Sequence, residues 1–88
     1  MSLVCKGPEK RLDYQVDWGA ALADSRWDVE PAEPGGVALA SAARAGAVAL
    51  ATLEGGVAGS LYRVTNRVRT AAGEEKQRSL LVRVGHGR

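Results

Sequence analysis

Cysteine, histidine and long apolar runs are scarce in this chain of 88 residues, and each scarcity excludes a class of protein. Cys5 is the single cysteine, so an intrachain disulfide is impossible and a reducing cytoplasm is the expected place of synthesis. No apolar run approaches the roughly 18 residues of a membrane helix, and residues 1–6 are too few for the apolar part of a signal peptide. We therefore expect a protein that is made in the cytoplasm and contacts no membrane.

Groups that carry catalysis or bind metal ions are equally sparse. His86, the only histidine, lies between two glycines near the end of the chain, where nothing would hold it in place as a general base. Cys5 has no second cysteine or neighbouring histidine to activate it or to share a metal ion. Nucleophile elbows, phosphate-binding glycine loops and two-histidine metal motifs do not occur. The sequence predicts no catalytic, metal or cofactor site, and so a protein that is not an enzyme.

What remains is the composition of one ordinary folded domain. Hydrophobic residues make up 45% of the chain and charged residues 25%, so disorder is not expected. Twelve basic and ten acidic residues are interspersed along the chain and give a formal net charge of +2. This net charge is too weak to imply a nucleic-acid or membrane partner. We expect a single domain over residues 1–88, with flexible ends at about 1–8 and 85–88.

Apolar and polar residues alternate along several segments, which is typical of half-buried β-strands. The alternation is clearest over residues 11–18 and 60–70, and it returns over 25–30 and 80–84. Proline and glycine clusters separate these segments at 31–36 and 55–59, where proline removes backbone donors and glycine allows positive φ. An alanine-rich stretch of small residues over 19–24 separates the first two predicted strands.

Residues 37–54 are ambiguous, because eight of them are alanine and alanine favours a helix. Gly46 lies in the middle of this segment, however, and Val48 and Leu50 follow the two-residue repeat of a strand. We favour a hairpin that turns at about 44–46, with a helix as the open alternative.

Six to seven strands without a convincing amphipathic helix predict an all-β fold, an antiparallel β-sandwich of immunoglobulin-like or fibronectin type. The segment 59–68 resembles the penultimate strand of such domains, with Tyr62 at the position of a tyrosine corner. A tyrosine there buries its ring and holds the preceding loop with its hydroxyl. Val64 stands where antibody domains place a cysteine, so the resemblance implies a member without a disulfide.

The four aromatic residues fall on the inward sides of the predicted strands, where we expect them to form the core: Tyr14, Trp18, Trp27 and Tyr62. The rival interpretation is an exposed aromatic platform that binds carbohydrate. Asn66 lies on the same apolar side, and a buried amide is unfavourable unless it is paired. We therefore expect Asn66 to hydrogen-bond the backbone of a neighbouring loop.

Arg63, Arg67 and Arg69 share one face of the predicted strand 60–70 and form the strongest surface feature. They are candidates for contact with an acidic protein, and the alternative is that they only keep this face soluble and discourage edge pairing. Nucleic acid is the less favoured partner, because no aromatic residues alternate with the arginines to stack bases. Acidic residues of the second strand are expected to form a solvated face and not a calcium site: Asp24, Asp28 and Glu30.

A wider resemblance covers almost the whole chain. Its motifs are Lys6–Pro8, Leu12-Asp13-Tyr14-x-Val16-Asp17-Trp18, Ser25-x-Trp27-x-Val29 and Tyr62-x-Val64-Thr65-Asn66-Arg67-Val68. This layout is similar to small structural proteins of tailed phages and prophages, described as fiber-tail adaptor or tail-connector proteins. The resemblance implies an immunoglobulin-like component of the virion, present in several copies and packed against other structural proteins. The middle third departs from the pattern, being alanine-rich where threonine, serine and larger apolar residues are expected.

The first functional hypothesis is therefore a non-enzymatic structural protein of a phage or prophage virion, an adaptor of tail, neck or fiber. Its partners would be other phage structural proteins and further copies of itself, with neither nucleic acid nor membrane involved. A small carbohydrate-binding module is the second hypothesis, and an interaction domain of another bacterial assembly is the third. The direction in which Trp18 and Trp27 point separates the first two; the exact partner and oligomeric state stay open.

Overall fold

The computed structural model describes residues 2–85 of the chain, and their secondary structure is entirely β. The seven strands are β1 (Ser2–Lys6), β2 (Leu12–Asp17), β3 (Leu22–Glu30), β4 (Ala38–Ala45), β5 (Val48–Glu54), β6 (Leu61–Thr70) and β7 (Glu75–Val84). Within these residues there is no helix with the length and hydropathy that crossing a membrane requires.

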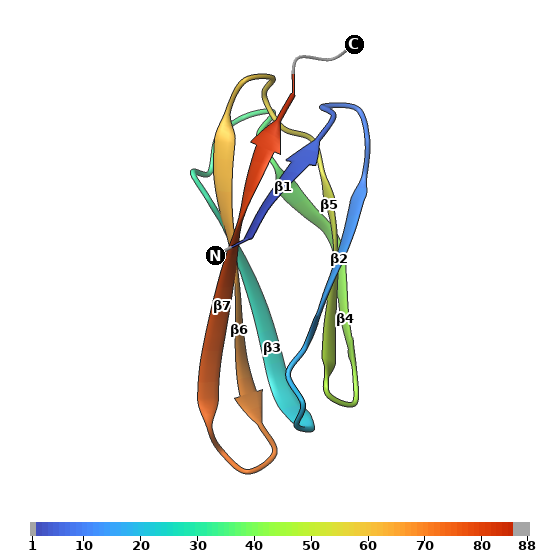
Figure 1. Cartoon of the computed structure of the whole chain (residues 1–88), viewed down its shortest axis with the longest axis vertical. Helices are drawn as coiled ribbons and strands as arrows, with labels where there is room; N and C mark the ends of the chain where they lie inside the picture. Colours follow the sequence, from blue (N-terminus) through green and yellow to red (C-terminus); the bar gives the residue numbers. More distant parts are fainter. Residues whose placement is uncertain (1, 86–88) are drawn as a thin grey trace.

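The strands form two sheets that pack face to face as an elongated sandwich measuring 44 × 21 × 18 Å (Figure 1). One sheet has the order β1-β7-β6-β3 and the other the order β2-β5-β4. Neighbouring strands are antiparallel, except that β1 runs parallel to β7. The orders β2-β5-β4 and β7-β6-β3 correspond to the B-E-D and G-F-C strands of an immunoglobulin domain. The predicted all-β sandwich of six to seven strands is confirmed, with seven strands observed.

Residues 37–54, for which the sequence left a helix open, form the hairpin that we favoured, made of β4 and β5. Its two-residue turn consists of Gly46 and Ala47, slightly later than predicted, and Gly46 has a φ of 60°, which suits the first central position of a type II′ turn. The inward side of β5 differs from the expected pattern, however. Small side chains at Ala49 and Ala51 face the core, while Val48 is only half-buried. Alanine fits at position 49 because the bulky indoles of Trp18 and Trp27 pack against the same cluster.

Within the segment 1–8, residues 2–6 form strand β1, which was not predicted from the sequence. Val4 pairs with Val82 and packs against the core, so the strand depends on a partner distant in the sequence. Lys6 is buried, and its Nζ donates hydrogen bonds to the carbonyl of Gly55 at 2.6 Å and to that of Gly7 at 2.9 Å. Of the predicted C-terminal end, 86–88 lie outside the described residues.

Strand β3 also begins earlier than expected, because residues 22–24 were assigned to an interruption. Leu22 is buried and pairs with Thr70, whereas Asp24 pairs with Arg69. One extra residue, Ala23, therefore lies between two successive pairs, which is a β-bulge. The bulge shifts the alternation by one position and hides the strand from a two-residue pattern.

The core consists of two clusters of buried side chains between the sheets. The larger contains Val37, Leu53, Tyr62, Val64, Leu80, Val82 and Val84, and the smaller contains Leu22, Ala49 and Val68. Trp27 packs against both clusters and so joins them. The four-stranded sheet supplies most of the large side chains of these clusters from its inward positions. Its outward positions are available for contact with solvent or a partner.

Candidate partner-binding face

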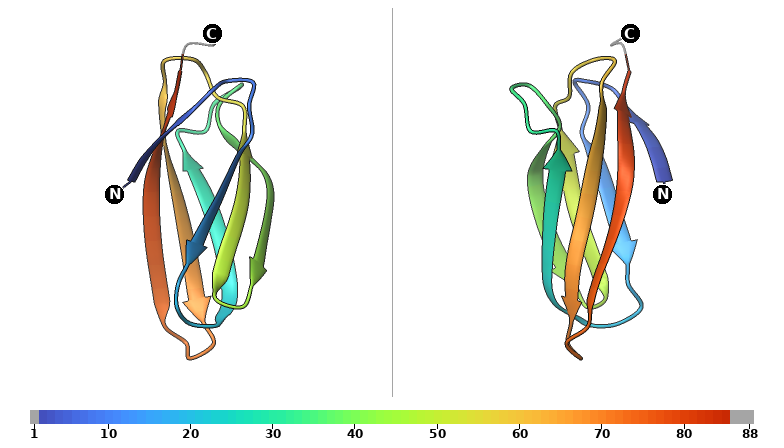
Figure 2. Two further views of the ribbon diagram at one scale, coloured as in Figure 1. Left: turned by 45° about the vertical axis from the view of Figure 1, so that its right-hand side comes forward. Right: turned by 90° about the vertical axis from the view of Figure 1, so that its left-hand side faces the viewer.

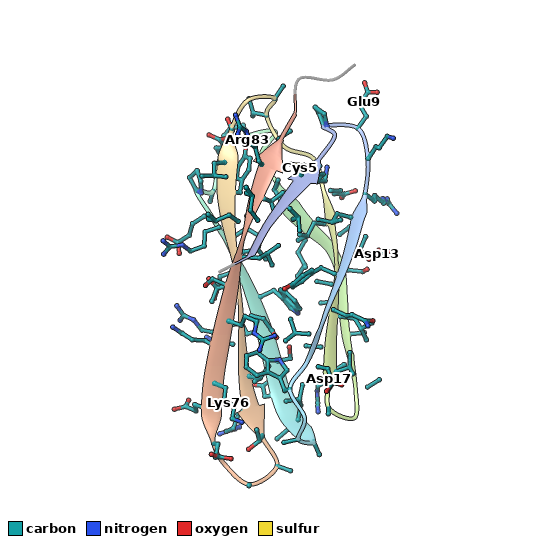
Figure 3. The ribbon with its side chains drawn as sticks, in the orientation of Figure 1. Cys5, Glu9, Asp13, Asp17, Lys76 and Arg83 are labelled. Atoms are coloured by element: carbon teal, nitrogen blue, oxygen red, sulfur yellow. The ribbon has the colours of Figure 1, made fainter. Side chains whose placement is uncertain are left out.

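The side of the four-stranded sheet that points away from the other sheet, here called the outer face, carries the predicted arginines. Arg63, Arg67 and Arg69 are all exposed on β6. They share one face but not one cluster, since Arg67 and Arg69 lie toward the Lys76 end of β7 and Arg63 lies toward the Arg83 end. Figure 3 labels Lys76 and Arg83 at these two ends.

Strand β3 brings acidic side chains next to these arginines. The acids are Asp24, Asp28 and Glu30. An oxygen of Asp28 lies 3.9 Å from Nε of Arg67, and the register sets the other two acids across from Arg69 and Arg63. The two surfaces that the sequence suggested separately are thus one face of alternating charge. Within residues 2–85, no three histidine, cysteine, aspartate or glutamate side chains lie close enough together to hold a metal ion.

One pair of like charges stands out on this face, because Arg26 of β3 lies directly across from Arg67. Like charges across a strand pair are unfavourable unless acidic groups lie close by. Both side chains line a shallow depression, hereafter the charged half of the outer face. Its exposed charged and amide-bearing residues are Asp24, Arg26, Arg67, Arg69, Glu75, Lys76 and Gln77. Sequence analysis missed Arg26, since only the register of β3 against β6 places it there.

The other end of the outer face carries exposed apolar side chains among the charges of Arg63 and Arg83. Leu3 is 56% exposed, Leu61 is 51% exposed, and Leu81 is half-buried between the strands that carry them. These three leucines, hereafter the apolar half, were not singled out in the sequence, because each belongs to a different strand. Exposed apolar groups rimmed by charge are a common feature of protein–protein interfaces.

Comparison with known protein families is decisive for the class of protein. A family model described as podophage GP4 fiber-tail adaptor protein gp77 matches residues 6–83. The chain belongs to this family of fiber-tail adaptors. The match confirms the resemblance inferred from the sequence motifs and includes the whole charged half of the outer face. A search of curated proteins found no match.

A fiber-tail adaptor is a structural component of the phage tail, so this adaptor is part of a virion and interacts with other tail proteins. The matched residues run from the end of β1 to the penultimate residue of β7 and contain both sheets. The family assignment therefore applies to the sandwich as a whole.

Tyr62 fixes the loops at the apolar end of the adaptor. Its ring is fully buried, its hydroxyl accepts a hydrogen bond from the Val57 amide at 3.1 Å, and the same hydroxyl donates to the Glu33 carboxylate. Val57 precedes β6 and Glu33 lies between β3 and β4, so one side chain holds two loops. Gly36 lies so close that a Cβ there would stand 3.2 Å from the Tyr62 ring.

Asn66 is buried. From the sequence we expected its amide to bind the backbone of a neighbouring loop, but in the structure the amide joins strands. Its Oδ1 accepts from Trp18 Nε1 at 2.9 Å, and its Nδ2 donates to Ser25 Oγ and to the carbonyl of Arg26, each at 3.0 Å. Both Nδ2 partners lie on β3. Three bonds nearly exhaust what an amide side chain can make, so the polar group is well accommodated in the core.

The other three aromatic residues also turn inward and are half-buried. Tyr14 meets Trp27 edge to face, with ring centroids 6.2 Å apart and planes at 83°. The guanidinium carbon of Arg78 lies 5.3 Å from the centre of the Trp18 ring and covers it. These rings do not form the flat exposed platform on which a sugar would stack.

Proposed function

We propose that this fiber-tail adaptor works without catalysis, by binding a neighbouring tail protein through its outer face. The observation that carries the proposal is the pair Arg26 and Arg67, two exposed arginines directly across from each other in the charged half. Acidic groups of a partner would relieve their mutual repulsion, which Asp28 offsets only for Arg67, at 3.9 Å. The description of the family as a structural adaptor supports the absence of catalysis.

The two halves of the outer face have different parts in this contact. Leu3, Leu61 and Leu81 supply apolar area, which gives most of the free energy of association. The charges of the other half select the partner and its orientation, since exposed ion pairs contribute little affinity each. The loops next to the apolar half are held by Tyr62, so the surface is formed before the partner arrives.

The test uses a phage whose own adaptor gene is deleted and complemented by plasmid-borne variants. The double variant Arg26→Glu, Arg67→Glu should abolish incorporation of the adaptor into particles and lower the titre by several orders of magnitude. The matched control is Lys10→Glu, Arg11→Glu, which changes net charge equally at exposed residues away from the outer face. Equal incorporation of both proteins, with each shown to be folded by circular dichroism, would disprove the role of this face.

No observation favours the carbohydrate-binding alternative. Trp18 and Trp27 pack against the smaller core cluster, which is the opposite of what that hypothesis requires. In the folded adaptor, tryptophan emission should be blue-shifted and poorly quenched by iodide, and denaturant should reverse both properties.

A further inference from the structure

Strand β4 is an edge of the three-stranded sheet and lacks the features that usually protect such an edge. All eight of its residues are exposed, and five of them are alanine. Solvent-facing strands normally carry threonine or larger β-formers, and edges normally carry lysine or other charges. The left view of Figure 2 shows no other segment outside β4. The strand therefore has neither the composition of a solvated surface nor a cover from the other residues that the structure describes.

Its single charge is also turned away from the edge. Nη1 of Arg44 donates to the Leu22 carbonyl of β3 at 2.7 Å. The edges β2 and β3, in contrast, carry several acidic residues on their outward sides, Asp13 and Asp17 on β2 and Asp24, Asp28 and Glu30 on β3, and β1 is only five residues long. Two copies meeting antiparallel along β2 around Gln15 would set Asp13 across from Asp17, whereas two copies meeting along β4 would set two charges across from each other only in a register centred on Arg44.

The turn geometry shows which backbone groups are free. Ala45 and Val48 flank a two-residue turn and so form a hydrogen-bonded pair, as they do in hairpins of this kind. Because the pattern alternates along an antiparallel ladder, the N–H and C=O groups of Ala42 and Arg44 point away from β5. A bulge interrupts the ladder between Leu39 and Ser41, which leaves 41–45 as the regular part of the edge.

We infer that two copies of the chain associate antiparallel along β4, around a two-fold axis at Ala43. This register sets Ala42 of each copy across from Arg44 of the other, so the free backbone groups pair in both directions. Ala43 then faces its own counterpart as a non-hydrogen-bonded pair, with Cα atoms about 4.5 Å apart. The result is one continuous six-stranded sheet.

This contact is short, so the dimer is weak in dilute solution. A regular edge of five residues is smaller than the roughly 1,200 Å² that a stable interface buries. The fraction of dimer should therefore rise with concentration and become large only where many copies are held together, as in a particle. The inference is independent of the proposed function, because β4 and the outer face belong to different sheets.

The experiment is disulfide trapping of the full chain in a Cys5→Ser background. Under mild oxidation, Ala43→Cys should give a covalent dimer in high yield, since its Cα separation suits a disulfide. Ala45→Cys is the matched control, exposed on the same side of the same strand, but about 13 Å from its counterpart in this register. Equal yields from both variants, or no dimer from Ala43→Cys, would overturn the inference.

Two further measurements test the same contact, and the second needs no engineered cysteine. Adding Ala42→Pro to the Ala43→Cys protein removes one free N–H and should lower the yield of covalent dimer severalfold, while circular dichroism verifies the fold. In the wild-type chain, hydrogen exchange at the amides of Ala42 and Arg44 should slow as concentration rises. Exchange rates there that do not depend on concentration would contradict the dimer.

Discussion

Trp18 donates its indole N–H to Oδ1 of Asn66, and this 2.9 Å bond links the end of β2 in one sheet to β6 in the other. The same amide binds β3 through two further hydrogen bonds. The buried Asn66 amide thus connects the two sheets beside the smaller core cluster. The buried apolar residues of that cluster are Leu22, Ala49 and Val68. We therefore expect the Asn66 amide to contribute strongly to the stability of this end of the sandwich.

Replacing Asn66 with alanine should lower the free energy of unfolding by about 2–4 kcal/mol, because it leaves buried donors and acceptors unpaired and opens a cavity. Urea unfolding followed by circular dichroism measures the change. The control is Gln77→Ala on exposed β7, which should change stability by less than about 0.5 kcal/mol. A similar loss in both variants would show that the hydrogen bonds of Asn66 are not the cause.

Tyr62→Phe tests the hydroxyl that holds two loops. Loss of its bonds to the Val57 amide and the Glu33 carboxylate should destabilise the fold by about 1–3 kcal/mol. Tyr14→Phe is the matched control, since no hydrogen bond of the Tyr14 hydroxyl is found within residues 2–85. Denaturant midpoints of the two variants should differ clearly, and equal midpoints would contradict the role of the corner.

Gly56→Ala tests the tight packing of the loop before β6. Gly56 has a φ of 118°, and a Cβ there would stand 2.6 Å from Cγ2 of the buried Val84. Strain and overpacking together should reduce stability by about 2–4 kcal/mol. Gly19→Ala separates the two effects, because Gly19 also has positive φ but no atom within 4 Å of an added Cβ. A loss of about 1–2 kcal/mol is expected there, from backbone strain alone.

Lys6 predicts a dependence of stability on alkaline pH. Burial lowers the pKa of its ammonium group below 10.5, and the nearby Glu54 carboxylate opposes this only in part. As pH rises between the folded and unfolded pKa values, the unfolded chain holds more protons than the folded one, so the contribution of Lys6 becomes more favourable. The wild type should therefore gain stability relative to Lys6→Met as the pH rises toward the ordinary lysine pKa of 10.5.

Urea unfolding of both proteins at several pH values measures this difference, and titration of groups common to both cancels. Parallel pH profiles for wild type and variant would show that the pKa of Lys6 is the same in both states.

The sequence predicted those strands whose alternation is uninterrupted, such as β2 and β6. It missed β1, whose five residues carry little signal and depend on pairing with β7, and it missed the start of β3, where the bulge at Ala23 shifts the alternation. The family could be recognised because its motifs span several strands.

The charged half of the outer face could be predicted only in part. Alternation places Arg67 and Arg69 on one side of a strand, but it does not say which strand lies beside them or in what register. The approach of Arg26 and Asp28 to Arg67 follows from the β3–β6 pairing, which lies outside any local pattern. For the same reason, three leucines on three strands formed an apolar surface that the sequence did not reveal.

The parallel pairing of β1 with β7 has a mechanical consequence for a tail component. Residue 2 begins β1 and residue 84 ends β7, so tension applied near the two ends of the described chain pulls these strands in opposite directions along their length. The hydrogen bonds between them run across the direction of pull and must break together, in shear, and not one after another as in a peeled hairpin. The sandwich is therefore built to resist stretching between its ends more strongly than its modest core would suggest.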